Sequence, residues 1–160
     1  FHAGAEPRRD HGGAAGMRWV IEGNLADLRA HGGGVLDDAA VAALATASQA
    51  ALDRQAARLD RRRDAGLVRQ GHGDLHLRNI VRLRGEPTLF DAIEFNDAIA
   101  CTDMLYDLAF LLMDLWRRRL WRHANAVLNG YAAEAPDPDG LALLPLFQSC
   151  RAAVRPKAFS

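Results

Sequence analysis

The sequence lacks the features that typically mark nucleic-acid or membrane proteins. It carries no net charge, because 20 basic residues balance 20 acidic ones, so bulk attraction to nucleic acid or to an anionic surface is not indicated. Its apolar runs, such as DLAFLLMDLW, are far shorter than the roughly 20 residues that cross a bilayer. We therefore expect no nucleic-acid partner and no membrane partner.

Cysteine is scarce as well. Cys101 and Cys150 are the only two, and they match neither a metal-ligand spacing nor a disulfide framework. No basic segment followed by an apolar one opens the chain. These observations predict a reduced, cytoplasmic protein. Because the chain begins at Phe1 inside an aperiodic run and stops without a capping signal, we also expect it to be part of a larger protein.

Apolar periodicity is what the chain does contain, and an apolar fraction of 49% over 160 residues is enough for one folded domain. Four segments repeat apolar residues at helical spacing. The predicted helices lie at about 17–30, from Asp37 or Asp38 to Gly66, at 102–131, and at 141–154 with Pro145 inside it or at its start. Alternation around a Gly-Glu-Pro turn predicts a β-hairpin within 79–91. The fold class is therefore α+β and mostly helical.

The stretch GHGDLHLRN, residues 71–79, concentrates polar side chains in one predicted loop. Phosphoryl transfer needs a carboxylate that orients or deprotonates the attacking hydroxyl, and oxygen ligands that hold Mg²⁺ against the phosphates. Asp74 lies five positions before Asn79, so a compact loop can direct the carboxylate at a hydroxyl and the amide at a metal. The hairpin then returns Asp91 to the same loop.

The order of residues in this loop also resembles a known family. His72-Gly73-Asp74-Leu75-His76-Leu77-Arg78-Asn79 has the spacing of the kinase catalytic loop, and the form HGDLHLRN resembles the aminoglycoside phosphotransferase family, with which choline and fructosamine kinases share their plan. LFDAIEFND resembles that family's metal-binding segment, and DMLYDLAFLLMDL resembles its following helix. Together with LPLFQSCRAAVR, these segments are similar to bacterial proteins that join a phosphotransferase-like domain to a P-loop ATP-binding domain.

The resemblance implies the carboxyl-terminal lobe of a protein-kinase-like fold, with the small hairpin carrying the metal site. Residues 66–155 would form the catalytic core, 1–65 a helical part of the lobe, and 156–160 a truncated tail. Asp-Ala-Ile stands at 91–93 where protein kinases have Asp-Phe-Gly, so we expect no switchable activation loop.

The family's functional residues map onto matching positions of this chain. The resemblance implies that Asp74 is the catalytic base, and that Asn79 and Asp91 bind Mg²⁺ and, through it, ATP or GTP. Glu94 is a further carboxylate near the metal. The residues that would support the loop are His72, His76 and Asp107. The implied reaction transfers a phosphoryl group to a hydroxyl of a small-molecule acceptor.

The nucleotide clamp of a kinase is missing from the sequence. Such a clamp needs a glycine-rich strand loop and a strand lysine, but Lys157 is the only lysine and HGGG at 31–34 lies between predicted helices. No P-loop motif G-x-x-x-x-G-K-[ST] occurs either. We therefore expect a missing amino-terminal lobe as partner, a fused P-loop domain as a further candidate partner, and an inactive fragment when this chain stands alone.

Other interpretations stay open at this point. A degenerate kinase fold would be a non-catalytic regulatory or scaffold module. His72, Asp74 and His76 alternate and could bind zinc in a metallohydrolase, although the next histidine is His123. A lone Asp or Asn in a turn often serves only backbone hydrogen bonding.

The sequence does not indicate where an acceptor would bind. The acidic residues Asp97, Asp103 and Asp114 are too scattered to predict an acidic surface for a polycationic substrate. Nothing favours Trp121 or Tyr131 as residues of a substrate pocket.

Overall fold

The computed structural model describes residues 1–31, 37–135 and 137–154. The glycines at 32–34, Lys157 and the tail at 156–160 lie outside these ranges. The α-helices are α1 (Gly13–His31), α2 (Asp38–Asp64), α3 (Asp97–Ala100), α4 (Met104–Arg117), α5 (Trp121–Glu134) and α6 (Leu144–Val154). The 3₁₀ turns are η1 (His2–Gly4), η2 (Leu77–Asn79) and η3 (Gly140–Leu143). The prediction of a mostly helical α+β fold is confirmed.

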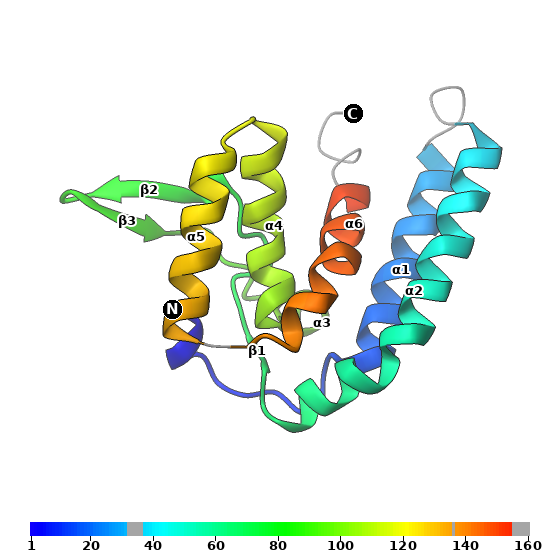
Figure 1. Ribbon diagram of the computed structural model, residues 1–160, viewed down its shortest axis with the longest axis horizontal. Helices are drawn as coiled ribbons and strands as arrows, with labels where there is room; N and C mark the ends of the chain where they lie inside the picture. Colours follow the sequence, from blue (N-terminus) through cyan, green and yellow to red (C-terminus); the bar gives the residue numbers. More distant parts are fainter. Residues whose placement is uncertain (32–36, 136, 155–160) are drawn as a thin grey trace.

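The helices form a stack in which α4 occupies the centre. Figure 1 shows the antiparallel pair α1 and α2 on one side, α5 on the other, and α6 and α4 between them. The core is built around the apolar side of α4, where Leu108 and Leu112 are buried and the Tyr106 ring meets the Phe147 ring of α6 edge-on at 5.4 Å. None of the helices in the described ranges is long and apolar enough to cross a membrane.

Two small antiparallel sheets complete the fold. β1 (Val68–Gln70) pairs with β4 (Cys101–Asp103), and β2 (Ile80–Leu83) pairs with β3 (Glu86–Leu89) in the hairpin that projects past α5 in Figure 1. The predicted hairpin is therefore present. Its turn lies at Arg84-Gly85 rather than at Gly-Glu-Pro, because both residues have positive φ, the combination that a two-residue hairpin turn requires.

The predicted core helix over 102–131 is wrong as a single element, because the chain turns between α4 and α5. Arg119 has φ 60°. The Arg119 N–H donates to the Trp116 carbonyl at 2.9 Å, and the Leu120 N–H donates to the Leu115 carbonyl at 2.9 Å. These two bonds and the left-handed residue form a Schellman motif, which ends a helix. Glycine is the usual residue at this left-handed position, but here it is Arg119. The sequence therefore has no residue that marks the helix end, and the apolar stripe does not indicate the break.

Three further boundaries differ from the predictions. The first helix begins at Gly13 rather than at about 17, and Thr102 lies in β4 instead of starting the core helix. The last helix begins at Leu144 after η3, which places Pro145 in its first turn. A proline is compatible with that position because the first N–H groups of a helix have no partner inside it.

A buried ion pair holds the start of α4 against α2. Arg62 and Asp103 are 5% and 6% exposed, and Arg62 donates from Nε at 2.6 Å and from Nη2 at 2.9 Å to the two carboxylate oxygens. Asp103 also caps α4, because its Oδ1 accepts from the Leu105 N–H at 2.9 Å. Burial opposes the charge of Arg62, but the bonds to Asp103 and to Asp137 keep its pKa above the ordinary value. The pair therefore sets where α4 begins.

Replacing Arg62 with alanine leaves Asp103 buried without its cation, so we expect the free energy of unfolding to fall by about 3–5 kcal/mol. The neighbouring residue supplies a matched control, because the Arg61 side chain is 65% exposed and a surface ion pair contributes at most about 1 kcal/mol. Urea denaturation of Arg62→Ala and Arg61→Ala measures both effects. If the two variants lost the same free energy of unfolding, the Arg62–Asp103 pair would not be what holds the start of α4.

Candidate active site

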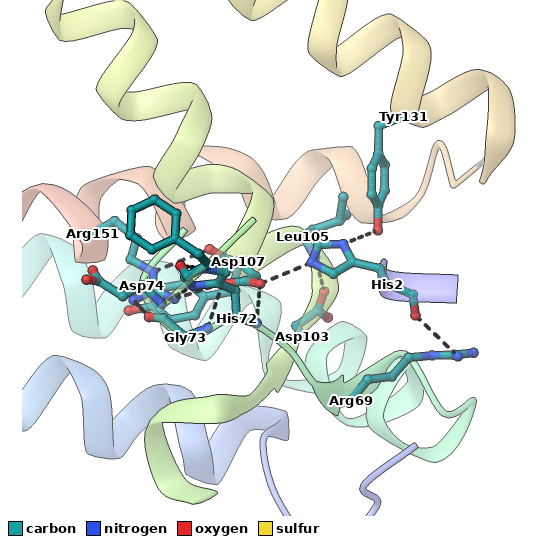
Figure 2. Close-up of polar contacts among 12 residues, drawn as sticks. His2, Arg69, His72, Gly73, Asp74, Asp103, Leu105, Asp107, Tyr131 and Arg151 are labelled. Atoms are coloured by element: carbon teal, nitrogen blue, oxygen red, sulfur yellow. Dashed lines mark hydrogen bonds and ion pairs between the residues drawn. The ribbon is translucent and has the colours of Figure 1, made fainter. Parts of the chain in front are cut away.

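The loop at 71–79 is anchored on a single buried carboxylate. Asp107 of α4 is 0% exposed, and it accepts from the His72 N–H at 2.8 Å and from the Gly73 N–H at 3.1 Å. Figure 2 shows Asp107 between this loop and His2 of η1. Hydrogen bonds to a charged group contribute about 1.5–3 kcal/mol each. The main chain of the loop is thus fixed immediately before Asp74.

Two further groups compensate the charge of Asp107. His2 Nε2 lies 3.1 Å from its Oδ2, and Arg151 Nη2 of α6 lies 3.8 Å from its Oδ1. Burial alone would raise the pKa of Asp107, but the His2 hydrogen bond and the charge of Arg151 hold it below the ordinary value. The carboxylate is therefore ionised while it holds the loop.

Close packing explains two of the glycines in the loop. A Cβ on Gly71 would lie 2.9 Å from Asp107 Oδ2, which leaves no room for a side chain. Gly73 has φ 79°, and a Cβ there would lie 3.1 Å from Ile93. Only glycine adopts this left-handed conformation without strain. The loop approaches α4 and residue 93 at these two points.

His72 is fully buried and both of its ring nitrogens are engaged. Its Nε2 donates to the Phe90 carbonyl at 2.9 Å, and its Nδ1 accepts from the Asp74 N–H at 3.4 Å. A zinc ligand needs an unprotonated nitrogen directed at the metal, so this geometry does not fit the metallohydrolase alternative. The ring instead joins the loop to the segment that follows the hairpin.

Asp74 and Asn79 lie together in the loop. Asn79 is buried, and its Nδ2 donates to the Asp74 carbonyl at 3.0 Å and to Asp74 Oδ2 at 3.1 Å. The Asp74 side chain is 39% exposed, and His76 Nε2 lies 3.4 Å from its Oδ2. The His76 ring meets the Phe110 ring edge-on at 5.4 Å. Asp74 is thus an oriented carboxylate that solvent or a ligand can reach.

Asp91 and Glu94 follow the hairpin and are both exposed. Main-chain bonds place their segment against the loop: the Phe90 N–H donates to the Asn79 carbonyl at 3.1 Å, and the Ile93 N–H donates to the His72 carbonyl at 2.9 Å. Within residues 1–31, 37–135 and 137–154, no group of three or more His, Cys, Asp or Glu side chains is arranged to hold a metal ion. A metal site at Asn79 and Asp91 therefore stays a prediction.

A cavity of about 350 Å³ adjoins Asp74 and Gly73. Its walls come from α1, α4, α6 and residues 93–102, and they include Trp19, Tyr106 and Arg151. Burial raises the pKa of Tyr106 to about 12, so its hydroxyl is neutral at ordinary pH. The arrangement brings a reachable carboxylate to the edge of a mostly apolar space, where an acceptor hydroxyl could be deprotonated.

Sequence reasoning missed several residues of this site. His2 and Trp19 come from distant parts of the chain that carry no motif, and Arg151 lies in the segment LPLFQSCRAAVR, to whose residues the resemblance assigned no role. Asp114 had a signal, because it lies seven residues after Asp107 inside the apolar stripe of α4. It is fully buried and accepts from the Leu77 N–H of η2 at 3.1 Å.

The acidic and aromatic residues that the sequence offered for acceptor binding, namely Asp97, Asp103, Asp114, Trp121 and Tyr131, do not line this cavity. Asp103 and Asp114 are buried inside the fold, and Trp121 is exposed at the start of α5. Tyr131 lines a second cavity, between α4 and α5, and bonds to His2 Nδ1 at 3.1 Å.

Comparison with known proteins identifies the class of this chain. The model of the APH phosphotransferase enzyme family matches residues 7–144, so the chain belongs to this family of phosphotransferases. Similar proteins include uncharacterised proteins of Mycobacterium bovis and of two strains of Mycobacterium tuberculosis, each 31% identical over 145 residues. These matches cover 91% of this chain but 29% of each relative. No solved structure matches the chain significantly.

Replacing Asp107 with asparagine removes the charge and leaves a buried N–H of the loop without its acceptor, so we expect the free energy of unfolding to fall by on the order of 2 kcal/mol at neutral pH. The pKa of Asp107 is lower in the folded chain than its unfolded value of about 3.9. Its carboxylate therefore stabilises the fold above that pH, and this contribution is lost as the pH falls toward the lower folded-state pKa.

Urea denaturation between neutral pH and pH of about 3 measures this effect, and the difference between the parent and Asp107→Asn is expected to shrink below about pH 4. Asp139→Asn changes an exposed carboxylate and serves as the control, with little effect at any pH. A difference that widens at acid pH would contradict the anchoring role of an ionised Asp107.

Proposed function

We propose that this chain carries the catalytic loop of a phosphotransferase that moves the γ-phosphoryl group of ATP or GTP to a hydroxyl of a small molecule. The observation that supports this most directly is the geometry of Asp74, a half-exposed carboxylate oriented by Asn79 at the edge of a cavity. Membership of a phosphotransferase family supports the same reaction. The acceptor binds in that cavity with its hydroxyl against Asp74.

Asp74 acts as the general base in this mechanism. The acceptor oxygen attacks the γ-phosphorus, the new O–P bond forms, and the bond from phosphorus to the β–γ bridging oxygen breaks to release the nucleoside diphosphate. The proton of the hydroxyl passes to Asp74 and then to solvent. Positioned proton transfer of this kind contributes about 10²–10⁴ to the rate. The anchoring of the loop on Asp107 keeps Asp74 in place during the reaction.

Asn79 and Asp91 are the residues that hold Mg²⁺ in this proposal. The donor set fits the ion, because Mg²⁺ prefers carboxylate and amide oxygens. The Asn79 NH₂ group bonds to Asp74, so the amide oxygen is its atom for a metal. Glu94 is a further candidate ligand. When bound, Mg²⁺ neutralises charge on the phosphates.

In this proposal, a segment of the complete protein outside this chain supplies the glycine-rich loop and the lysine that bind the nucleotide. The relatives extend far beyond the matched region, since the match covers 29% of their length, and they have room for an amino-terminal lobe or a P-loop domain. The proposal is therefore tested on the complete gene product.

Substituting Asp74 with asparagine keeps the shape of the side chain but removes the base, so we expect kcat for acceptor-stimulated ADP release to fall by about 10²–10⁴. The assay measures Mg²⁺-dependent ADP release against aminoglycosides, choline, amino sugars and sugars. Asp53→Asn, an exposed carboxylate on α2, is the matched control and is expected to keep full activity. Release that is indifferent to Asp74 would favour a non-catalytic regulatory module instead.

The Asp91→Ala variant is expected to lose Mg²⁺-dependent ATP binding, because a carboxylate ligand of the metal is removed. Isothermal titration calorimetry with and without Mg²⁺ measures this loss. Glu86→Ala changes an exposed carboxylate of β3 and should leave binding unchanged. Normal Mg·ATP binding by Asp91→Ala would refute the assignment of Asp91.

A further inference from the structure

One face of α1 forms a wall of the cavity beside Asp74. The lining residues of this helix recur every three to four positions, the spacing that places side chains on one side of a helix. They are Trp19, Val20, Gly23, Asn24 and Asp27. Gly23 lies within this row, and a Cβ built on it meets no atom within 4 Å. The wall therefore has a gap where a glycine replaces a side chain.

The other walls are mostly apolar and aromatic. Ile93, Ile99 and Phe110 line the cavity together with Tyr106. Among the described residues that line it, Asp27 is the only carboxylate besides Asp74. Apart from these two carboxylates, the walls offer few partners to a ligand with several ammonium groups, and uncompensated burial of a charge is costly.

The guanidinium of Arg151 is a further part of the wall. Arg151 lines the cavity and is 4% exposed, and its guanidinium lies 3.9 Å from the centre of the Tyr106 ring and 4.8 Å from that of Phe110. Its Nη1 donates to the Gly73 carbonyl at 3.0 Å, directly before Asp74. Because a guanidinium only donates hydrogen bonds, Arg151 offers no partner to an ammonium group of a ligand.

Two buried polar atoms of lining residues have no hydrogen-bond partner in the described part of the chain. Thr102 lines it, and the buried Thr102 Oγ1 has no hydrogen-bond partner among the described residues. The same holds for the buried Nη2 of Arg151, which has only the 3.8 Å ionic contact with Asp107. Buried polar groups in folded proteins are normally paired, so an unpaired hydroxyl on a cavity wall points to a ligand that supplies the partner.

We propose that this cavity binds the acceptor of the proposed phosphotransfer and selects an uncharged alcohol with a compact apolar or aromatic body over a polycation. The inference rests on the proposed function for the role of the ligand as acceptor. The apolar body packs against Trp19, Ile99 and Phe110, the reacting hydroxyl faces Asp74, and a second polar group of the ligand reaches Thr102. At about 350 Å³, the cavity lies at the lower end of small-molecule sites, which span roughly 300–1,000 Å³.

The test measures binding without nucleotide, so it does not depend on phosphotransfer. The complete gene product is titrated with 2-cyclohexylethanol, a neutral alcohol that does not absorb where tryptophan does, and separately with kanamycin as the polycation. Trp19 lines the cavity, so its fluorescence reports occupancy. The other two tryptophans of this chain, Trp116 and Trp121, and any tryptophan in the rest of the gene product are replaced by phenylalanine to isolate that signal.

Two glycine substitutions provide a matched pair of variants. Gly23 and Gly130 are both exposed helical glycines with no atom within 4 Å of a built Cβ, and leucine raises helix propensity at either place. Gly23→Leu fills the cavity, so we expect the Kd of 2-cyclohexylethanol to rise about tenfold or more, by at least about 1.4 kcal/mol. Gly130→Leu lies on α5, away from the cavity, and should leave the Kd unchanged.

The outcomes separate this inference from the proposed function. Saturable alcohol binding that Gly23→Leu weakens and Asp74→Asn retains supports the inference, even if no phosphoryl transfer is detected. Kanamycin binding that is tighter than alcohol binding and is weakened by Gly23→Leu overturns it, and so does alcohol binding that is indifferent to Gly23→Leu. In either of those cases, phosphoryl transfer to an aminoglycoside would leave the proposed function standing.

Discussion

The buried carboxylate of Asp107 is the interaction on which the rest of the site depends. A charge without solvent is costly unless it is paired, and here its partners are two backbone N–H groups of the loop, His2 and Arg151. If the loop left α4, the Asp107 carboxylate would lose its two N–H partners and remain unpaired inside an apolar core. The position of Asp74 is therefore set by the central helix rather than by the exposed hairpin beside it.

Three buried carboxylates position the elements around α4. One belongs to the residue that caps the helix, and two belong to the helix itself. Asp103 binds α2 through Arg62, Asp107 binds the loop, and Asp114 binds η2. Apolar packing is non-directional, whereas each of these hydrogen bonds has a defined length and angle. The apolar stripe brings the neighbours of α4 close, and the buried carboxylates decide their orientation.

Local patterns predicted most of the fold and the centre of the site, because the contacts involved are close in sequence. Asp74 and Asn79 meet inside one short loop, and the hairpin follows from alternation over a few residues. The helix break at Arg119 escaped prediction because no glycine marks it. Arg151 and Trp19 reach the cavity from helices at opposite ends of the chain, and no periodicity or motif encodes which distant faces will meet. The metal role of Asp91 depends on side-chain orientation, which spacing does not specify.

The link between the loop and residues 90–93 has a consequence for how the sequence can change. The Phe90 and Ile93 N–H groups and the Phe90 carbonyl make the bonds, so the side chains of these two residues take no part in them. Mutations at 90 and 92 can therefore accumulate while Asp91 keeps its place beside the loop, provided that the backbone groups remain available. The composition of positions 90 and 92 is therefore free to change. That of Ile93, which lines the cavity, and of His72, Gly73 and Asp107 is not, because the contacts depend on the side chains of these residues or, at Gly73, on the absence of one.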